Sequence, residues 1–157
     1  MAANRDLSPA QVLALIPQQA PFRFVDEIVE IDEHSVVGRY TFRPDEMFYA
    51  GHFPGYPITP GVILLESMCQ VGVVALGIFL VARESSPEHA EEFLTFFSDA
   101  NVEFMQPVKP GQTVTIKGQR VFWRRKKLRT KVEMFLEDGA LVAQATVAGM
   151  GVRKDDG

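Results

Sequence analysis

The chain has 157 residues, 46% of them hydrophobic, which is enough to bury one continuous core. Its 20 acidic and 16 basic residues give a formal net charge of −4, so it lacks the overall positive field that a nucleic-acid partner needs. The single cysteine, Cys69, excludes an intrachain disulfide framework and a cysteine-rich zinc site, and it fits a reducing compartment. Residues 1–11 contain no apolar run typical of a signal peptide, so we expect a cytoplasmic protein.

The first predicted elements are a short helix and a β-hairpin. Ser8 and Gln11 have the spacing of a capping box, which predicts a helix that ends near residue 17. Residues 24–31 and 36–42 are rich in β-branched and aromatic side chains and are separated by a polar turn. They predict two paired strands.

Residues 43–61 follow and include four prolines and three glycines. This density is incompatible with regular structure and predicts an irregular but stiff loop. Loops of this kind often carry functional residues.

A helix is predicted with Thr59 as its cap and Pro60 in its first position, followed by the apolar residues 61–82. Its apolar residues cover every face, so other elements must surround it. The segment approaches the length of a bilayer span, but Glu66 would cost about 2.5 kcal/mol or more deep in a bilayer. Residues 67–82 alone are shorter than the roughly 20 that a span needs. We therefore predict a buried helix and no membrane span.

The remaining sequence predicts the strands that surround this helix. Apolar and polar residues alternate over 128–136 and 141–147, so one face of the sheet is buried. Turn signals lie at 109–111 and 138–139. The result is one α+β domain over residues 1–157, with about six antiparallel strands that curl around the helix. The predicted downstream strands are 94–98, 102–105, 113–123, 128–136 and 141–150.

Three groups between residues 51 and 70 suggest chemistry. His52 lies in the stiff loop, and a histidine with an ordinary pKa of about 6.5 suits a general base. Glu66 lies in an apolar helix, where burial without a partner or a task is costly. Burial favours its protonated form and the helix N-terminus opposes that shift, which leaves its protonation state open. Gly61, expected at the second helical position, offers a free backbone N–H that can polarise a carbonyl oxygen.

Ordinary structural roles compete with these interpretations. A lone histidine in a Gly/Pro loop is more often a structural or surface residue than a catalytic one. Gln70 lies one turn after Glu66 and is expected to hydrogen-bond to it and hold its rotamer. Cys69 has no basic neighbour and is expected to be a small core residue.

The segment resembles a known family. Gly-His-Phe-Pro-Gly at residues 51–55 is followed by Pro57, by Pro-Gly-Val at 60–62, by Glu66 fourteen positions after the histidine, and by Gln70. This combination closely resembles the hotdog-fold 3-hydroxyacyl-acyl-carrier-protein dehydratases of bacterial fatty acid synthesis, in their glutamate-type branch. Residues 21–26 and 104–111 also resemble that family, and the resemblance covers roughly residues 14–150.

The resemblance implies an antiparallel sheet wrapped around one long central helix, with His52 and Glu66 as the catalytic pair. It implies dehydration without isomerisation, on a substrate carried by the phosphopantetheine of acyl carrier protein, with no metal or other cofactor. It also implies a homodimer or a trimer of dimers, in which His52 of one chain faces Glu66 of the other. The implied substrate-binding residues are Phe53, Gly61, Val62 and Gln70, with the thioester carbonyl at the N–H of Gly61.

Several points stay open. A hotdog acyl thioesterase and a non-catalytic protein that binds acyl carrier or acyl chain are the alternatives. Thr59 stands where family members often have methionine, so acyl chain length is open, as is the choice between primary fatty acid synthesis and a specialised lipid or polyene pathway. A basic cluster at a predicted hairpin tip is either a docking surface for an acidic carrier protein or a solvated turn. Its residues are Arg124, Arg125, Lys126, Lys127 and Arg129.

Overall fold

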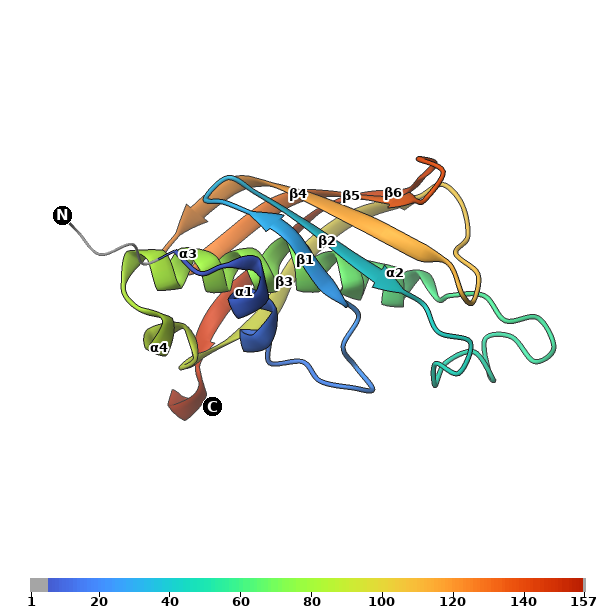
Figure 1. The fold of residues 1–157 in the computed structure, drawn as a ribbon, viewed down its shortest axis with the longest axis horizontal. Helices are drawn as coiled ribbons and strands as arrows, with labels where there is room; N and C mark the ends of the chain where they lie inside the picture. Colours follow the sequence, from blue (N-terminus) through green and yellow to red (C-terminus); the bar gives the residue numbers. More distant parts are fainter. Residues whose placement is uncertain (1–5, 157) are drawn as a thin grey trace.

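A computed structural model describes residues 6–156 of the chain (Figure 1). One long helix in three segments lies along one face of a sheet, and short helices lie near its far end. In chain order the elements are α1 (Pro9–Leu15), β1 (Glu27–Ile31), β2 (Ser35–Thr41), α2 (Gly61–Cys69), η1 (Gln70–Ala75), α3 (Leu76–Glu84), α4 (Pro87–Ala90), β3 (Phe93–Phe104), β4 (Thr113–Arg124), β5 (Lys127–Leu136), β6 (Leu141–Arg153) and η2 (Lys154–Asp156).

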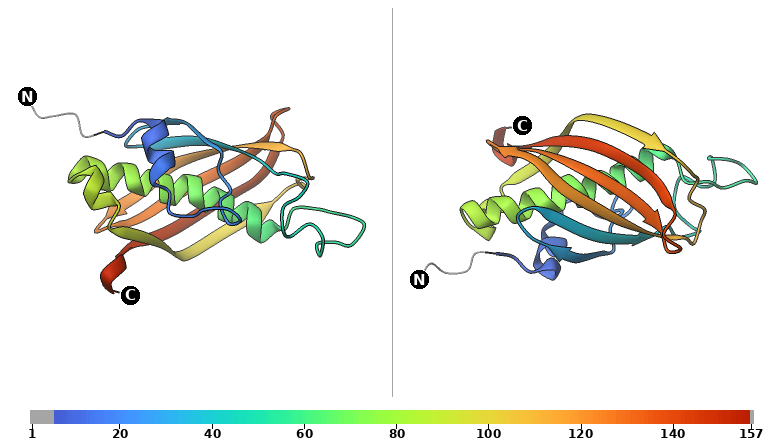
Figure 2. Two further views of the ribbon diagram at one scale, coloured as in Figure 1. Left: turned by 60° about the horizontal axis from the view of Figure 1, so that its bottom comes forward. Right: turned by 90° about the horizontal axis from the view of Figure 1, so that it is seen from above.

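The six strands form a single antiparallel sheet in the order β1-β2-β4-β5-β6-β3. The sheet curls around the central helix, which crosses beneath it (Figure 2). β5 buries alternate residues against the helix, as its sequence pattern predicts. The predicted α+β architecture is confirmed.

The middle of the central helix fixes it to the sheet. η1 is a π-helical segment, and all six of its residues are buried. A Cβ on Gly72 would lie 2.6 Å from the side chain of Val132, so only glycine permits this close approach. The hydroxyl of Thr130 donates a hydrogen bond to the Gly72 carbonyl at 2.8 Å. Residues Gly61–Glu84 are long and apolar enough to cross a membrane, but 72% of their most apolar window is buried in the protein, as expected of a core helix.

Three local predictions are wrong. Residues 94–98 and 102–105 belong to one strand, β3, at the edge of the sheet. Its pairing with β6 shifts register after Phe97 and then continues through the polar middle of the strand. Thr59 does not cap the helix, because Pro60 occupies the N-cap and the Thr59 hydroxyl pairs with Tyr49. Gly61 is consequently the first helical residue and not the second.

Candidate active site

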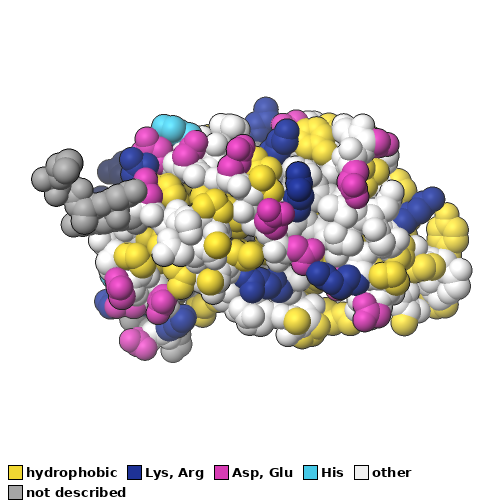
Figure 3. Space-filling model, in the orientation of Figure 1, with side chains coloured by type: hydrophobic (Ala, Val, Ile, Leu, Met, Phe, Trp, Pro, Cys, Tyr) yellow, Lys and Arg dark blue, Asp and Glu magenta, His cyan; other side chains and the backbone are white. Residues whose placement is uncertain are grey.

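The loop between β2 and α2 projects beyond the start of the central helix (Figure 1). Hydrophobic side chains reach the surface at this end of the molecule (Figure 3). Such exposure is unusual for large apolar side chains and is typical of a surface that binds something. The most exposed of them are Met47 (57%), Phe53 (52%), Tyr56 (69%) and Val62 (74%).

Hydrogen bonds within the loop orient His52. Its Nδ1 lies 2.9 Å from the carbonyl oxygen of Ile58, and the Ile58 N–H donates back to the His52 carbonyl at 2.9 Å. The imidazole stacks on Phe53 with ring centroids 4.1 Å apart. Because a carbonyl can only accept, Nδ1 must carry the proton. In the neutral imidazole, Nε2 is then the nitrogen with a free lone pair.

Glu66 is half-buried on α2, and its environment favours the protonated carboxyl. Burial raises its pKa, while a hydrogen bond from Gln70 opposes the shift. The donor atom, Gln70 Nε2, lies 3.4 Å from Glu66 Oε2, so the predicted pairing is present in the structure. A raised pKa makes a carboxyl a better general acid than one at its ordinary value.

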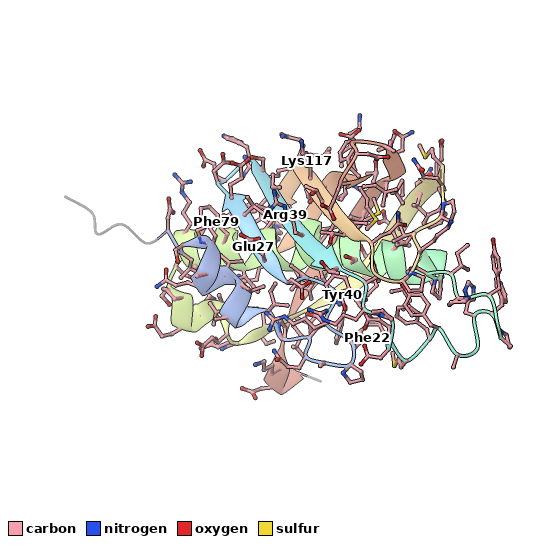
Figure 4. The ribbon with its side chains drawn as sticks, turned by 45° about the vertical axis from the view of Figure 1, so that its right-hand side comes forward. Phe22, Glu27, Arg39, Tyr40, Phe79 and Lys117 are labelled. Carbon is pink, nitrogen blue, oxygen red and sulfur yellow. The ribbon has the colours of Figure 1, made fainter. Side chains whose placement is uncertain are left out.

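Gln70 is fully buried and links Glu66 to the segment before β1. Its Oε1 accepts from the Phe24 N–H at 2.7 Å, and its Nε2 also donates to the Phe22 carbonyl at 2.9 Å. The neighbouring hydroxyl of Ser67 donates to the Phe24 carbonyl at 2.7 Å. Figure 4 shows Phe22 on the loop that leads into β1. Gln70 therefore connects Glu66 to the backbone of this segment. Its predicted contact with substrate stays a prediction.

Gly61 begins α2, where the first backbone N–H groups have no acceptor within the helix and the helix dipole favours negative charge. A Cβ at this position would lie 3.1 Å from the ring of Phe104, so the glycine leaves room for that ring above the helix end. Val62 beside it is the most exposed large apolar residue in the described part of the chain. Residues 104–111 resemble the family in sequence, but the contact between Phe104 and Gly61 spans 43 positions, so sequence reasoning missed the place of Phe104 beside Gly61.

His52 and Glu66 both lie at this end of the molecule, but neither a hydrogen bond nor an ion pair between them occurs within residues 6–156. His52 pairs with Ile58, and Glu66 pairs with Gln70. Within the described residues, these two side chains thus have different hydrogen-bond partners.

The predicted basic cluster lies elsewhere. Arg125 and Lys126 form the turn between β4 and β5, with positive φ values of 52° and 60°. Next to them, Trp123 Nε1 donates to Glu84 at the last residue of the central helix. A helix of 24 residues rises by about 36 Å. The turn is therefore at the opposite end of the molecule from Gly61 (Figure 2).

Only part of the cluster is free to bind a partner. Arg129 forms an ion pair with Asp99 at 2.7 Å, and the Lys126 ammonium lies 4.9 Å from the centre of the Phe93 ring. Arg124 and Arg125 are exposed at the tip.

Comparison with known proteins identifies the family of the chain. Residues 16–146 match the family model of the FabA-like domain, and the chain belongs to that family. The 3-hydroxyacyl-[acyl-carrier-protein] dehydratase FabZ of Acidiphilium cryptum is 34% identical over 161 residues, covering 99% of this chain and 92% of that protein. The FabZ of Chloroflexus aggregans is 38% identical over 120 residues, covering 76% of this chain and 78% of that protein.

Solved structures share the hotdog architecture. The dehydratase heterocomplex ApeI:P from Xenorhabdus doucetiae superposes with a TM-score of 0.75 at 15% identity, covering 95% of this chain and 94% of that one. Thioesterase HI1161 from Haemophilus influenzae gives a TM-score of 0.66 at 14% identity, with 98% and 96% covered. At these identities the likeness establishes the fold alone.

Proposed function

We propose that the protein is a 3-hydroxyacyl-[acyl-carrier-protein] dehydratase. It removes water from a 3-hydroxyacyl thioester on the phosphopantetheine of acyl carrier protein and yields the trans-2-enoyl thioester, in cytoplasmic fatty acid synthesis or a related lipid or polyene pathway. The observation that carries this proposal is His52, whose Nδ1 pairs with the Ile58 carbonyl and leaves Nε2 free to act as a base. The FabZ relatives, which align along most of the chain, support it.

In the proposed reaction, His52 Nε2 removes a proton from the carbon next to the thioester. The electron pair of that C–H bond forms the double bond, and the bond to the 3-hydroxyl breaks. Glu66, whose pKa is raised by burial, is proposed to donate a proton to the departing hydroxyl directly or through water. The N–H of Gly61 stabilises the negative charge that develops on the thioester oxygen. Transfer of the proton from His52 to the Glu66 carboxylate restores both groups.

Phe53 and Val62 are proposed to contact the substrate around these groups, since both are exposed apolar side chains beside His52 and Gly61. The elimination involves no net oxidation or reduction, and three protein groups meet its demands. The proposal therefore includes no metal or redox cofactor.

A homodimer, alone or within a trimer of dimers, completes the proposal, and β3 supports it. This strand is at the edge of the sheet, and none of its 12 residues is buried. Phe96, Phe97 and Phe104 are 56%, 43% and 47% exposed along it. An open edge with aromatic side chains favours pairing with a second copy. In such a dimer His52 of one chain is proposed to face Glu66 of its partner.

Sedimentation tests the dimer. The expected result is a dimer or a multiple of it at micromolar concentration. A monomer that is active at that concentration contradicts the shared site.

A thioesterase is the second candidate, because thioesterases share the fold and a carboxylate can activate water for attack on a thioester. Incubation of the purified protein with a 3-hydroxyacyl thioester separates the candidates. Enoyl thioester supports the dehydratase. Free thiol without enoyl product rejects it in favour of the thioesterase, and absence of both products supports a binding protein.

A further inference from the structure

Two hydroxyl groups form a hydrogen bond between the two ends of the loop that carries His52. Tyr49 Oη and Thr59 Oγ1 are 2.6 Å apart, and each residue is only 5% exposed. The two residues stand on either side of the excursion that carries His52. Burial raises the pKa of the Tyr49 phenol, which therefore stays neutral and can donate a hydrogen bond to Thr59 or accept one from it. We refer to this pair as the hydroxyl clasp.

Stability alone does not explain the hydroxyl clasp. Replacing both partners of a buried hydrogen bond by apolar groups of the same shape is nearly neutral for folding. A buried hydroxyl pair differs from an apolar contact mainly in its direction, because a hydrogen bond constrains the angle at both oxygens. The hydrogen bond between Tyr49 and Thr59 therefore serves to fix the orientation of a neighbouring group.

The peptide group between Ile58 and Thr59 is that group. Its carbonyl is the acceptor for His52 Nδ1 at 2.9 Å, and its N–H donates to the Val108 carbonyl at 3.0 Å. Since a peptide group is planar, rotation of this unit would break both hydrogen bonds together. The side chain of Thr59 leaves the same unit and is held by Tyr49. Tyr49 is in turn packed against Phe48, with ring centroids 4.7 Å apart.

We propose that Tyr49 and Thr59 are positioning residues for His52. Their hydrogen bond fixes the plane of the 58–59 peptide, whose carbonyl holds the proton on Nδ1 and keeps Nε2 free and aimed at the substrate. The inference rests on the proposed function for the role of Nε2. The orientation of His52 that it describes is independent of the reaction.

Tyr49→Phe and Thr59→Val each remove one hydroxyl with little change in shape, and the double variant removes both. Each single variant leaves one buried hydroxyl unpaired, so we expect lower stability and a kcat reduced by about tenfold to 100-fold, with KM within about twofold. In the double variant stability should return toward the original value while kcat stays low. Thr59→Ser, which keeps the hydroxyl, should retain most of the rate.

A matched control tests for a general loss of stability. Thr130→Val removes a buried threonine hydroxyl far from the loop, so it should lower stability but leave kcat unchanged.

Nitrogen NMR of His52 separates this inference from the proposed function. The original protein should show a proton on Nδ1, and the double variant should show a mixture of the two tautomers. The tautomer of His52 can be measured even if the protein makes no enoyl product. A double variant that keeps both the tautomer and the original kcat overturns the inference, and so does a rate that recovers together with stability.

Discussion

The start and the middle of the central helix meet the rest of the chain in different ways. In the middle, η1 is buried completely and Gly72 touches the sheet so closely that no side chain fits. At the start, Val62 is 74% exposed. The segment before β1 and the His52 loop are held there by hydrogen bonds between side chains and backbone. Apolar packing sets position along the middle, while hydrogen bonds set orientation at the end that carries the chemistry.

This difference has a physical reason. Proton transfer needs polar groups at defined angles, and apolar packing does not define angles. Polar groups are costly to bury, so they belong at an end of the core that substrate can reach. The dense middle provides a fixed reference from which short hydrogen bonds can orient Glu66 and His52.

The largest expected effect lies at the start of the helix. His52→Ala and Glu66→Gln should each lower kcat for dehydration by about 10²-fold to 10⁴-fold, because each removes a proton-transfer group. Neither should disrupt the fold, since both residues are only partly buried. Steady-state kinetics and circular dichroism measure the two effects. Near-original turnover in a folded variant removes that residue from the mechanism.

The elements of the fold could be predicted because their signals are local. Ser8 and Gln11 form the expected capping box, and the alternation along 128–136 matches the buried face of β5. The sequence predicts two strands, 94–98 and 102–105, because polar Asp99 and Asn101 lie between them. At a sheet edge, however, polar residues need not be buried, so β3 continues through residues 99–101.

The candidate site was predictable only in part. His52, Gly61 and Glu66 stand within fifteen positions of one another in the sequence, and their motif is visible there. The contacts that orient them are not local: Gln70 holds Phe24 across 46 positions. Thr59 precedes a helix and has the chemistry of a cap, but its hydroxyl bonds to Tyr49 instead. A local rule cannot foresee a tertiary partner that competes for the same hydroxyl.

Two glycines of the central helix test how tightly its middle is packed. A Cβ on Gly72 would lie 2.6 Å from Val132, so Gly72→Ala should destabilise the fold by about 1–3 kcal/mol. Gly77, in the same helix, has room for a Cβ, whose nearest neighbour would be Leu128 at 3.9 Å. Gly77→Ala should therefore stabilise by about 0.5–1 kcal/mol, since alanine favours a helix. Denaturant unfolding measures both, and equal effects would mean that the middle is not tightly packed.

Glu66 gives a smaller, pH-dependent effect. Burial raises its pKa in the folded chain above the ordinary value of 4.5, so ionisation at higher pH costs folding stability. Glu66→Gln removes that cost. The stability of the Glu66→Gln variant relative to the original protein should rise as the pH passes upward through 4.5. This gain in stability should be complete above the raised pKa of Glu66. Thermal unfolding across this range tests the sign, and a gain that is largest in acid contradicts it.

The smallest expected effect concerns the turn between β4 and β5, at the other end of the molecule from Gly61. Arg124 and Arg125 are the exposed residues of the cluster and can attract an acidic carrier protein, whereas Lys126 packs on Phe93 and Arg129 pairs with Asp99. Arg124→Glu with Arg125→Glu should lower kcat/KM for carrier-linked substrate by less than about tenfold at low salt, and the loss should fade as salt screens the charges.

A small thioester analogue is the matched control for these charge reversals, because it needs no carrier and should be processed unchanged. Since the turn lies about 36 Å along the helix from Gly61 of its own chain, a carrier bound there would have to serve a site in another subunit. A selective loss on carrier-linked substrate would therefore support both the docking surface and the assembly. Equal losses on the two substrates would indicate damage to the fold, and no loss on either would make the cluster an ordinary solvated turn.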